Sequence, residues 1–324
     1  MTTKVRNNLS PILLREVDAV EILCLQDNFI DNASFDSNQI VQRASPGLVL
    51  SKGILAEHGF SVLVSTVVGD EVHRVLFDFG LSEYGAAYHN AEALNVDFSQ
   101  VEAMVLSHGH IDHFGGILPF ARKVDRKNVD LILHPGAFKE LRYFKDNVGN
   151  TVKVPSLSRA KLEAAGVSVI ASTKPRLLRD SGLLFLGEIS RKTKFEKGTR
   201  RLVFSNNGQE QVDLVEEDSA IVANVKNRGL VVVTGCAHSG LINTIRHAQG
   251  QTGVERVFAI FGGFHLSDPD SEVIEPTVEA LKQIDPQYIV PAHCTGHKAS
   301  FFLEKELPEK VLLNMSGTTM KFRA

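Results

Sequence analysis

The segment Ser107–His113 carries the residues best suited to chemistry in this chain. It places three imidazoles and one carboxylate within six residues, at His108, His110, Asp112 and His113. Neutral imidazole and carboxylate are ligands for Zn²⁺, Mn²⁺ and Fe²⁺. Alternate residues can face one ion and the next pair can face a second. The spacing therefore predicts a site for two metal ions, of the kind that makes a nucleophilic hydroxide near neutral pH.

The elements on either side of this run support that interpretation. Val101–Leu106 is expected to form a buried strand, and the glycines Gly115 and Gly116 mark a turn that leads into a helix. Ligands and catalytic groups collect at the ends of strands in α/β folds. A histidine-rich surface turn is the alternative, but four ligand-type residues directly after an apolar strand favour the metal site.

A second apolar strand also ends in ligand-type residues. Val231–Thr234 is followed by Cys236 and His238, which lie two residues apart and face the same way on extended backbone. We expect His238 to bind metal. Cys236 either ligates as well or packs as a small apolar side chain.

Candidate substrate contacts lie outside these strand ends. The paired glycines Gly262-Gly263 suggest a close backbone approach just before His265. His265 is a candidate to hold substrate or to act as a general acid, and a structural histidine is the alternative. Arg191, Lys192 and Lys194 lie in a charged loop that is expected either to contact a phosphate group or to be a solvated surface.

The run His-x-His-x-Asp-His after a strand resembles the metallo-β-lactamase superfamily. The resemblance implies that His108 and His110 bind a first metal ion, and that Asp112, His113 and the late His293 bind a second. It implies an α/β fold, an αβ/βα four-layer sandwich of two mixed sheets with flanking helices and the site at the sheet ends. It also implies Zn²⁺, as one or two ions, with Mn²⁺ or Fe²⁺ as alternatives.

Three later motifs narrow this resemblance to one branch. Thr234–Gly240, Gly262–Leu266 and Pro291–Gly296 are similar to the branch named for 7,8-dihydropterin-6-methyl-4-(β-D-ribofuranosyl)-aminobenzene-5'-phosphate synthase. The earlier segments Ala56–Ser61 and Phe77–Gly80 agree with it. On this basis Glu57 and His58 are added as candidate substrate contacts.

The chain departs from the wider superfamily at two positions. It has no His-Thr-x-Gly-Ser motif before the strand that reaches Gly235. The corresponding place holds Glu216, Glu217 and Asp218, so either one of these acids ligates or none does. Cys236 stands where many relatives carry the aspartate that bridges the metals. One tightly bound ion with a labile second ion is therefore the alternative to a full pair.

Three functions follow from these observations. The first is a metal-dependent hydrolase, in which a metal-bound hydroxide attacks a phosphoester of a small molecule and Asp112 orients or deprotonates the water. The first alternative is a synthase-type transferase that condenses a pterin pyrophosphate. The second alternative is a non-catalytic small-molecule-binding protein. Iron-binding relatives usually carry Glu at the place of His110, which disfavours a redox di-iron protein.

Composition restricts the setting in which these functions operate. The 324 residues are 43% hydrophobic and 23% charged with a net charge of −3, so neither nucleic acid nor a membrane is an expected partner. No apolar run is long enough to span a bilayer. The three cysteines Cys24, Cys236 and Cys294 form no disulfide framework, which predicts reduced thiols and a cytoplasmic protein. The sequence leaves the oligomeric state open.

The order of elements predicts one domain over residues 1–324. Strands come first and then alternate with helices, and this order repeats in the second half of the chain. Residues 1–17 are expected to be loose. Residues from about 135 to 215 are expected to form short strands and polar turns, as an insertion that covers the site.

Overall fold

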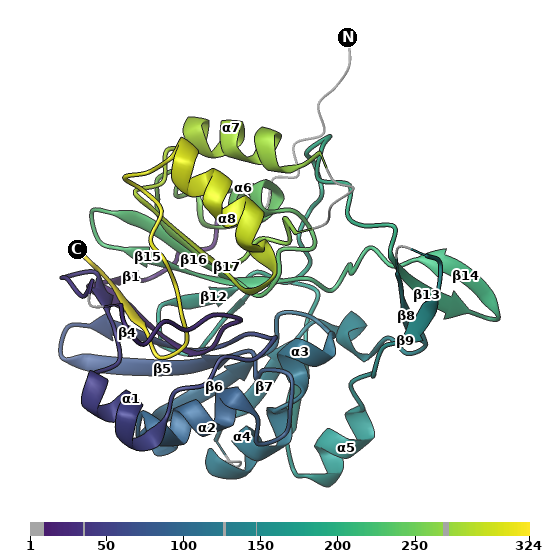
Figure 1. Cartoon of the computed structure of the whole chain (residues 1–324), viewed down its shortest axis with the longest axis horizontal. Coiled ribbons are helices and arrows are strands. Elements are labelled where there is room, and N and C mark those ends of the chain that lie inside the picture. The colour runs from purple at the N-terminus through teal and green to yellow at the C-terminus, as the bar shows by residue number, and fades with distance from the viewer. Residues whose placement is uncertain (1–9, 35, 126–127, 147, 268–271) are drawn as a thin grey trace.

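The structure, a computed structural model, describes residues 10–34, 36–125, 128–146, 148–267 and 272–324. Two large mixed sheets pack face to face, and helices cover their outer faces (Figure 1). Ile22 and Val64 of one sheet and Val233 and Phe261 of the other belong to one apolar core between the sheets. The predicted αβ/βα four-layer sandwich is thus confirmed.

The first sheet has eight strands in the order β10-β7-β6-β5-β4-β2-β19-β3. Its strands are β2 (Ala19–Gln26), β3 (Val41–Gln42), β4 (Ser61–Val68), β5 (Glu71–Phe77), β6 (Val101–Val105), β7 (Asp130–Leu133), β10 (Ser168–Ala171) and β19 (Thr319–Arg323). Strands β5, β6, β7 and β10 are parallel neighbours, and the rest of the sheet is antiparallel.

The second sheet has seven strands, with the order β11-β12-β15-β16-β17-β18 and β1 paired with β15. They are β1 (Glu16–Val17), β11 (Arg176–Leu177), β12 (Leu183–Phe185), β15 (Ala220–Val225), β16 (Gly229–Thr234), β17 (Val257–Gly263) and β18 (Tyr288–Ala292). Strands β16, β17 and β18 are parallel neighbours, so their carboxyl ends lie along one edge.

Helices complete the outer layers. They are α1 (Pro46–Lys52), α2 (Ala86–Ala93), α3 (Ile111–Phe114), α4 (Ile117–Lys123), α5 (Arg159–Ala164), α6 (Leu241–Thr252), α7 (Ile274–Ile284) and α8 (His297–Glu306), with short 3₁₀ turns η1 (Phe98–Gln100), η2 (Pro135–Phe138) and η3 (His293–Thr295). Helices α2 and α4 pack on the first sheet, and α6, α7 and α8 pack on the second. No helix among the described residues is long and apolar enough to cross a membrane.

Strands β6 and β16 explain why two apolar runs lead to the site. In β16, Val231 and Val233 face the core between the sheets, whereas Leu230 and Val232 belong to an outer cluster. Side chains on a strand alternate between its two faces, so a strand covered on both faces is apolar throughout. β6 shows the same division, and both strands end directly before ligand-type residues.

The segment from about 135 to 215 is divided among three sheets. Its strands β8 (Arg142–Lys145), β9 (Thr151–Lys153), β13 (Leu202–Asn206) and β14 (Gln209–Val212) form a small sheet that projects from one side (Figure 1). Its other strands, β10, β11 and β12, belong to the large sheets. The segment is therefore not one insertion.

Of residues 1–17, residues 1–9 lie outside the described residues, and Glu16–Val17 form β1 rather than a loose segment.

Candidate metal centre

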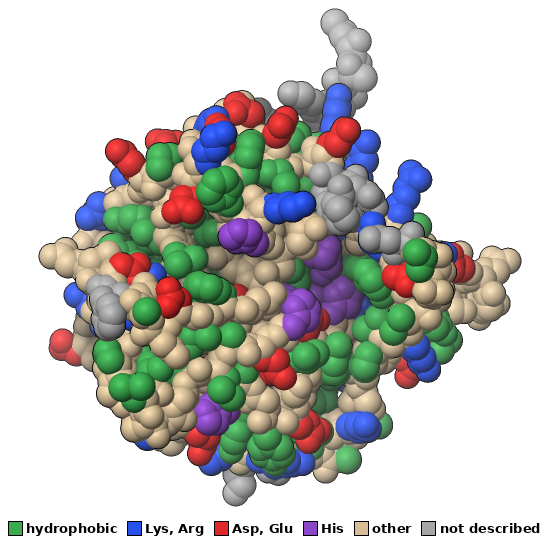
Figure 2. Space-filling view, viewed as in Figure 1, with side chains coloured by type: hydrophobic (Ala, Val, Ile, Leu, Met, Phe, Trp, Pro, Cys, Tyr) green, Lys and Arg blue, Asp and Glu red, His purple; other side chains and the backbone are tan. Residues whose placement is uncertain are grey.

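The predicted ligands meet at one edge of the sandwich, although they come from both sheets. His108 and His110 follow β6 of the first sheet, whereas His238 follows β16 and His293 follows β18 of the second. Figure 2 shows histidine side chains gathered in a hollow on this face of the molecule. The fold thus brings together residues that are more than a hundred positions apart.

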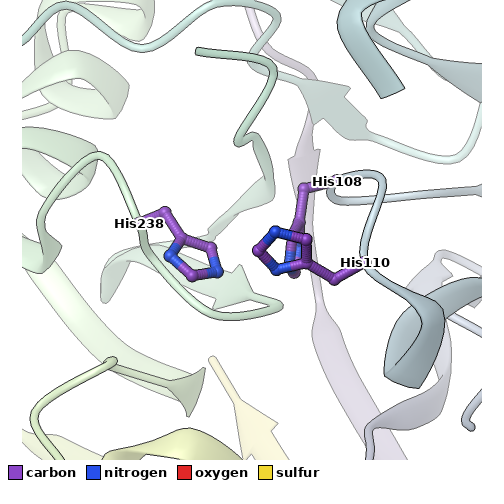
Figure 3. A group of neighbouring side chains, drawn as sticks. All are labelled: His108, His110 and His238. Carbon is purple, nitrogen blue, oxygen red and sulfur yellow. The ribbon is translucent and has the colours of Figure 1, made fainter. Parts of the chain in front are cut away.

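His108, His110 and His238 form a first ligand group. Their side chains point toward one another (Figure 3), and one ring nitrogen from each lies within 4.8 Å of the others. Nε2 of His110 and Nε2 of His238 are buried and have no hydrogen-bond partner in the part of the chain that the structure describes. Because a buried polar atom without a partner is costly, these nitrogens fit a bound cation.

Asp112 is the centre of a second ligand group. Its Oδ2 lies 3.1 Å from Nε2 of His293, 3.3 Å from Nε2 of His58 and 3.7 Å from Nε2 of His113. His58, predicted as a substrate contact, therefore stands beside the candidate ligands, with its side chain 63% exposed.

Cys236 lies between the two groups. Its Sγ is 3.1 Å from Nε2 of His113, and it forms a ligand set with His108 and His113 whose atoms lie within 4.8 Å of one another. A thiolate here stands where it can contact cations in both groups. Of the two interpretations of Cys236 that the sequence left open, ligand or packing residue, this position favours the ligand, and neither is tested.

Asp78, which follows β5, holds the candidate ligand His113 and the neighbouring Ser107 in place through hydrogen bonds. It accepts hydrogen bonds from the backbone N–H and the hydroxyl of Ser107, both at 2.7 Å. Its Oδ2 also lies 2.7 Å from Nδ1 of His113. A carboxylate on the far nitrogen of a ligating histidine holds the ring in place and raises its basicity. Sequence reasoning missed this role, although Asp78 lies in the Phe77–Gly80 motif.

Asp27 and Asn28, which follow β2, hold His293 in a similar way. Oδ1 of Asp27 accepts a hydrogen bond from the backbone N–H of His293 at 2.8 Å, and Oδ1 of Asn28 lies 3.0 Å from its Nδ1. Neither residue was predicted. Both lie in a polar turn after a strand, which is the only signal the sequence carries for them.

The electrostatic environment suits a cation. Burial and neighbouring imidazoles lower the pKa of His108 and His238 well below the usual value, so these rings are neutral and keep a free electron pair. Burial also lowers the pKa of His110, to about 3. Burial opposes charge on His113, but the carboxylates of Asp78 and Asp112 outweigh it and raise its pKa to about 9. The second group therefore favours positive charge.

The acidic segment Glu216–Asp218, which precedes β15, contacts the loops that carry the candidate ligands. Glu217 is buried and pairs with Arg142, a fully buried side chain of the small sheet that also donates to the carbonyl of Gly109. Asp218 accepts a hydrogen bond from the backbone N–H of Ser239, and Glu216 is exposed. Among the described residues, none of these three acids belongs to a ligand group.

A cavity of about 480 Å³ adjoins the first ligand group. We call the lining side chains of His238, His265 and Phe264, which are buried or half-buried, its inner wall, and those of Lys197, Arg200 and Arg201, which are exposed or half-buried, its outer wall. Glu196 and Glu272 also line the cavity. The sequence pointed to the same charged region but to different residues.

Three predicted substrate contacts have other partners. The Arg191 guanidinium donates to the carbonyl of Leu214, and the backbone N–H of Lys192 donates to Oδ1 of Asn243. Glu57 accepts from the backbone N–H of Ala86 at the start of α2. None of the three lines this cavity. A role in substrate binding stays a prediction for each.

Comparison with known proteins assigns the chain to a family. The model of the metallo-beta-lactamase superfamily matches residues 59–183. A 7,8-dihydropterin-6-methyl-4-(beta-D-ribofuranosyl)-aminobenzene-5'-phosphate synthase from Methanocaldococcus jannaschii is 30% identical over 270 residues, which cover 82% of this chain and 90% of that protein. The chain belongs to the metallo-β-lactamase superfamily.

Three further proteins are similar to this chain, and two of them are solved structures named for the β-lactamase superfamily or fold. An uncharacterized protein of Methanocaldococcus jannaschii is 29% identical over 76% of this chain and 88% of its own length. The crystal structure of a metal-dependent hydrolase of the β-lactamase superfamily matches with a TM-score of 0.70 and 25% identity, over 94% of this chain and 99% of that one. The fold protein YhfI from Bacillus subtilis matches with a TM-score of 0.51 and 11% identity, over 94% and 100% of the two chains, which shows the fold alone.

Membership of the metallo-β-lactamase superfamily supports metal binding by the ligand groups. The fold generally binds metal ions, and the histidine and cysteine groups described above could hold them. One of these relatives is named as a synthase and one solved structure as a metal-dependent hydrolase, which indicates an enzyme with a small-molecule substrate.

Proposed function

We propose that this protein is a metal-dependent hydrolase that cleaves a phosphoester of a small molecule. The observation that carries the proposal is the contact between the first ligand group and the cavity, since His238 belongs to both. A basic outer wall beside a metal-binding inner wall suits a substrate that carries a phosphate group.

The ligand sets determine which cations would bind. His108, His110 and His238 would hold one, and Asp112, His113 and His293 a second, with Cys236 between them. Imidazoles with a nearby thiol suit Zn²⁺ best, and the second ligand group, which contains the Asp112 carboxylate, would also suit Mn²⁺ or Fe²⁺. Cations here would supply Lewis acidity and would lower the pKa of coordinated water.

The remaining roles belong to side chains of this protein. Lys197, Arg200 and Arg201 would bind the phosphate charge at the outer wall of the cavity. His265 stands on the inner wall, with its ring centroid 4.1 Å from that of His238, where it could donate a proton to a leaving oxygen. Asp112, between His58 and His293, would orient the attacking water.

Hydrolysis in ¹⁸O-labelled water tests the proposal. Metals are first counted per chain by elemental analysis, and chromogenic phosphodiesters and phosphomonoesters are then screened. We expect Zn²⁺ in the purified protein and ¹⁸O in the released phosphate or phosphoester. The double variant His108→Ala, His110→Ala should lose the cation of the first ligand group and, with it, the turnover. Turnover that survives in this variant would contradict the mechanism.

A synthase-type transferase is the second candidate. The 30% identity over 82% of the chain to an enzyme named as such a synthase favours it. In this reaction an aryl-ribose phosphate would attack the methylene carbon of a dihydropterin pyrophosphate, and pyrophosphate would leave. The basic residues Lys197, Arg200 and Arg201 would bind the phosphates. For a synthase, pyrophosphate should be released only when the aryl-ribose phosphate is present. No ¹⁸O should be incorporated when the aryl-ribose phosphate is left out. These two results together would support the synthase over the hydrolase.

A further inference from the structure

We propose that Cys236, His265 and Cys294 form a third cation site, suited to a thiophilic divalent cation such as Zn²⁺ or Cd²⁺. The two Sγ atoms and one ring nitrogen of His265 all lie within 4.8 Å of one another. This site goes beyond the two ligand groups of the proposed function and does not depend on that function.

The sheet topology explains why these three side chains meet. Cys236 follows β16, His265 follows β17 and Cys294 follows β18, and these strands are parallel neighbours. Neighbouring strands run about 4.8 Å apart, so residues just beyond their carboxyl ends come within the reach of one cation. The juxtaposition therefore comes from three adjacent strand ends.

The backbone leaves room for the two thiols. A Cβ at Gly263 would lie 2.7 Å from Sγ of Cys294 and 3.3 Å from Cα of Cys236. The glycine therefore makes the close approach possible, and Sγ of Cys294 lies 3.7 Å from the carbonyl oxygen of Cys236. His265 has a left-handed backbone with φ of 47°, a conformation that is unfavourable for a non-glycine residue and so has to be held by its surroundings.

The donor set matches zinc chemistry. Two thiolates and one imidazole form a Cys₂His set, which in zinc enzymes leaves a fourth position open. His265 lines the 480 Å³ cavity, so an open position would face that cavity. Binding of a divalent cation would release the two thiol protons to solvent, and the bound unit would carry no net charge. Cys236 would then be a ligand shared between this site and the neighbouring group of His108 and His113.

Cadmium titration of the full-length, metal-stripped and reduced protein tests the site. Thiolate-to-cadmium charge-transfer absorption reports the number of thiolates on the cation, independently of any activity. We expect Cys294→Ser to reduce the absorption at saturation to about half, since one of two thiolates is lost. Cys24→Ala is the matched control, because Cys24 is a buried thiol that belongs to none of the ligand groups among the described residues, so its removal should leave the absorption unchanged.

Two further variants separate this site from the others. His265→Ala should weaken cadmium binding about tenfold or more while the absorption per bound cation is retained. The double variant His108→Ala, His110→Ala should keep the two-thiolate absorption even though it disrupts the first ligand group. Unchanged absorption in a folded Cys294→Ser protein would show that only Cys236 binds the cation and would overturn the proposal. So would loss of the absorption in the His108→Ala, His110→Ala protein.

Discussion

At the residue scale, the centre depends on side chains that hold the candidate ligands. Asp78 contacts both Ser107 and His113, and so connects two parts of the ligand run. Asn28 contacts Nδ1 of His293. A ligand histidine needs a fixed ring orientation, and these polar partners provide it. Their effect should therefore appear in metal affinity before it appears in folding.

Asp78→Asn tests this support directly. The variant keeps an oxygen for the backbone of Ser107 but removes the charge beside His113. We expect metal affinity to fall about 10–100-fold, measured by calorimetric titration of metal-stripped protein. Asp70→Asn, in the exposed turn between β4 and β5, is the control and should bind as the natural chain does. Equal affinities in the two variants would contradict the role of Asp78.

Gly109→Ala tests the packing behind the first ligand group. A Cβ at Gly109 would lie 2.3 Å from the carbonyl oxygen of Ala137 and 2.7 Å from Nη1 of Arg142. The backbone must therefore shift, and we expect a loss of about 1–3 kcal/mol in the free energy of unfolding in urea. Gly250→Ala, in α6 with open space around it, should instead stabilise the protein by about 0.5–1 kcal/mol. A neutral Gly109→Ala would show that the backbone yields freely.

At the element scale, buried strands deliver the ligands and the small sheet braces them. β6 and β16 predict the site because both are apolar on two faces and end in polar residues. For other elements, the sequence carried little indication of where they pair in the sheets. β19 inserts between β2 and β3, and its partners in β2 lie about 300 residues earlier in the chain. Arg142 of β8 shows that the small sheet also contributes to the site.

Arg142→Ala tests this brace. Arg142 lies between the buried carboxylates of Asp213 and Glu217 and donates to Gly109. Its removal leaves buried negative charge uncompensated, so we expect a loss of about 3–5 kcal/mol in the free energy of unfolding. Arg159→Ala, which removes an exposed pair with Glu163 and the contact of the guanidinium with the Phe138 ring, should cost at most about 1.5 kcal/mol. Similar losses in the two variants, measured by urea unfolding, would refute the brace.

At the scale of the whole molecule, the candidate centre joins the two sheets. His108 and His110 come from the first sheet, and His238 and His293 come from the second. A cation held by ligands from both sheets binds only when the sandwich is assembled. Metal binding should therefore stabilise the whole fold and not one part of it.

Metal removal tests this coupling. With free cation at 100 to 1,000 times its dissociation constant, binding stabilises the folded state by about 3–4 kcal/mol. We expect a chelator to lower the melting temperature of the metal-loaded protein in one cooperative transition, measured by calorimetry. The double variant His108→Ala, His110→Ala should respond much less. A chelator shift of equal size in that variant would show that the stabilising cation lies elsewhere.

By itself, the sequence predicted the candidate ligands that stand close together in the chain. His108, His110, Asp112 and His113 could be recognised because their spacing is local and an apolar strand precedes them. His238 and His293 could be recognised in a similar way, since His293 directly follows β18 and His238 lies four residues after the end of β16. The fold followed from the resemblance that these motifs carry, and comparison with solved structures confirmed it.

Only the tertiary structure decided which of these residues share a site and what supports them. The contacts of Asp78 with His113, of Arg142 with Glu217, and of Cys236 with Cys294 join residues far apart in sequence. The lining of the cavity by Lys197, Arg200 and Arg201, and not by Arg191 and Lys192, likewise follows from the tertiary structure. Such contacts depend on sheet register and on how the two sheets pack, and local side-chain patterns do not encode either.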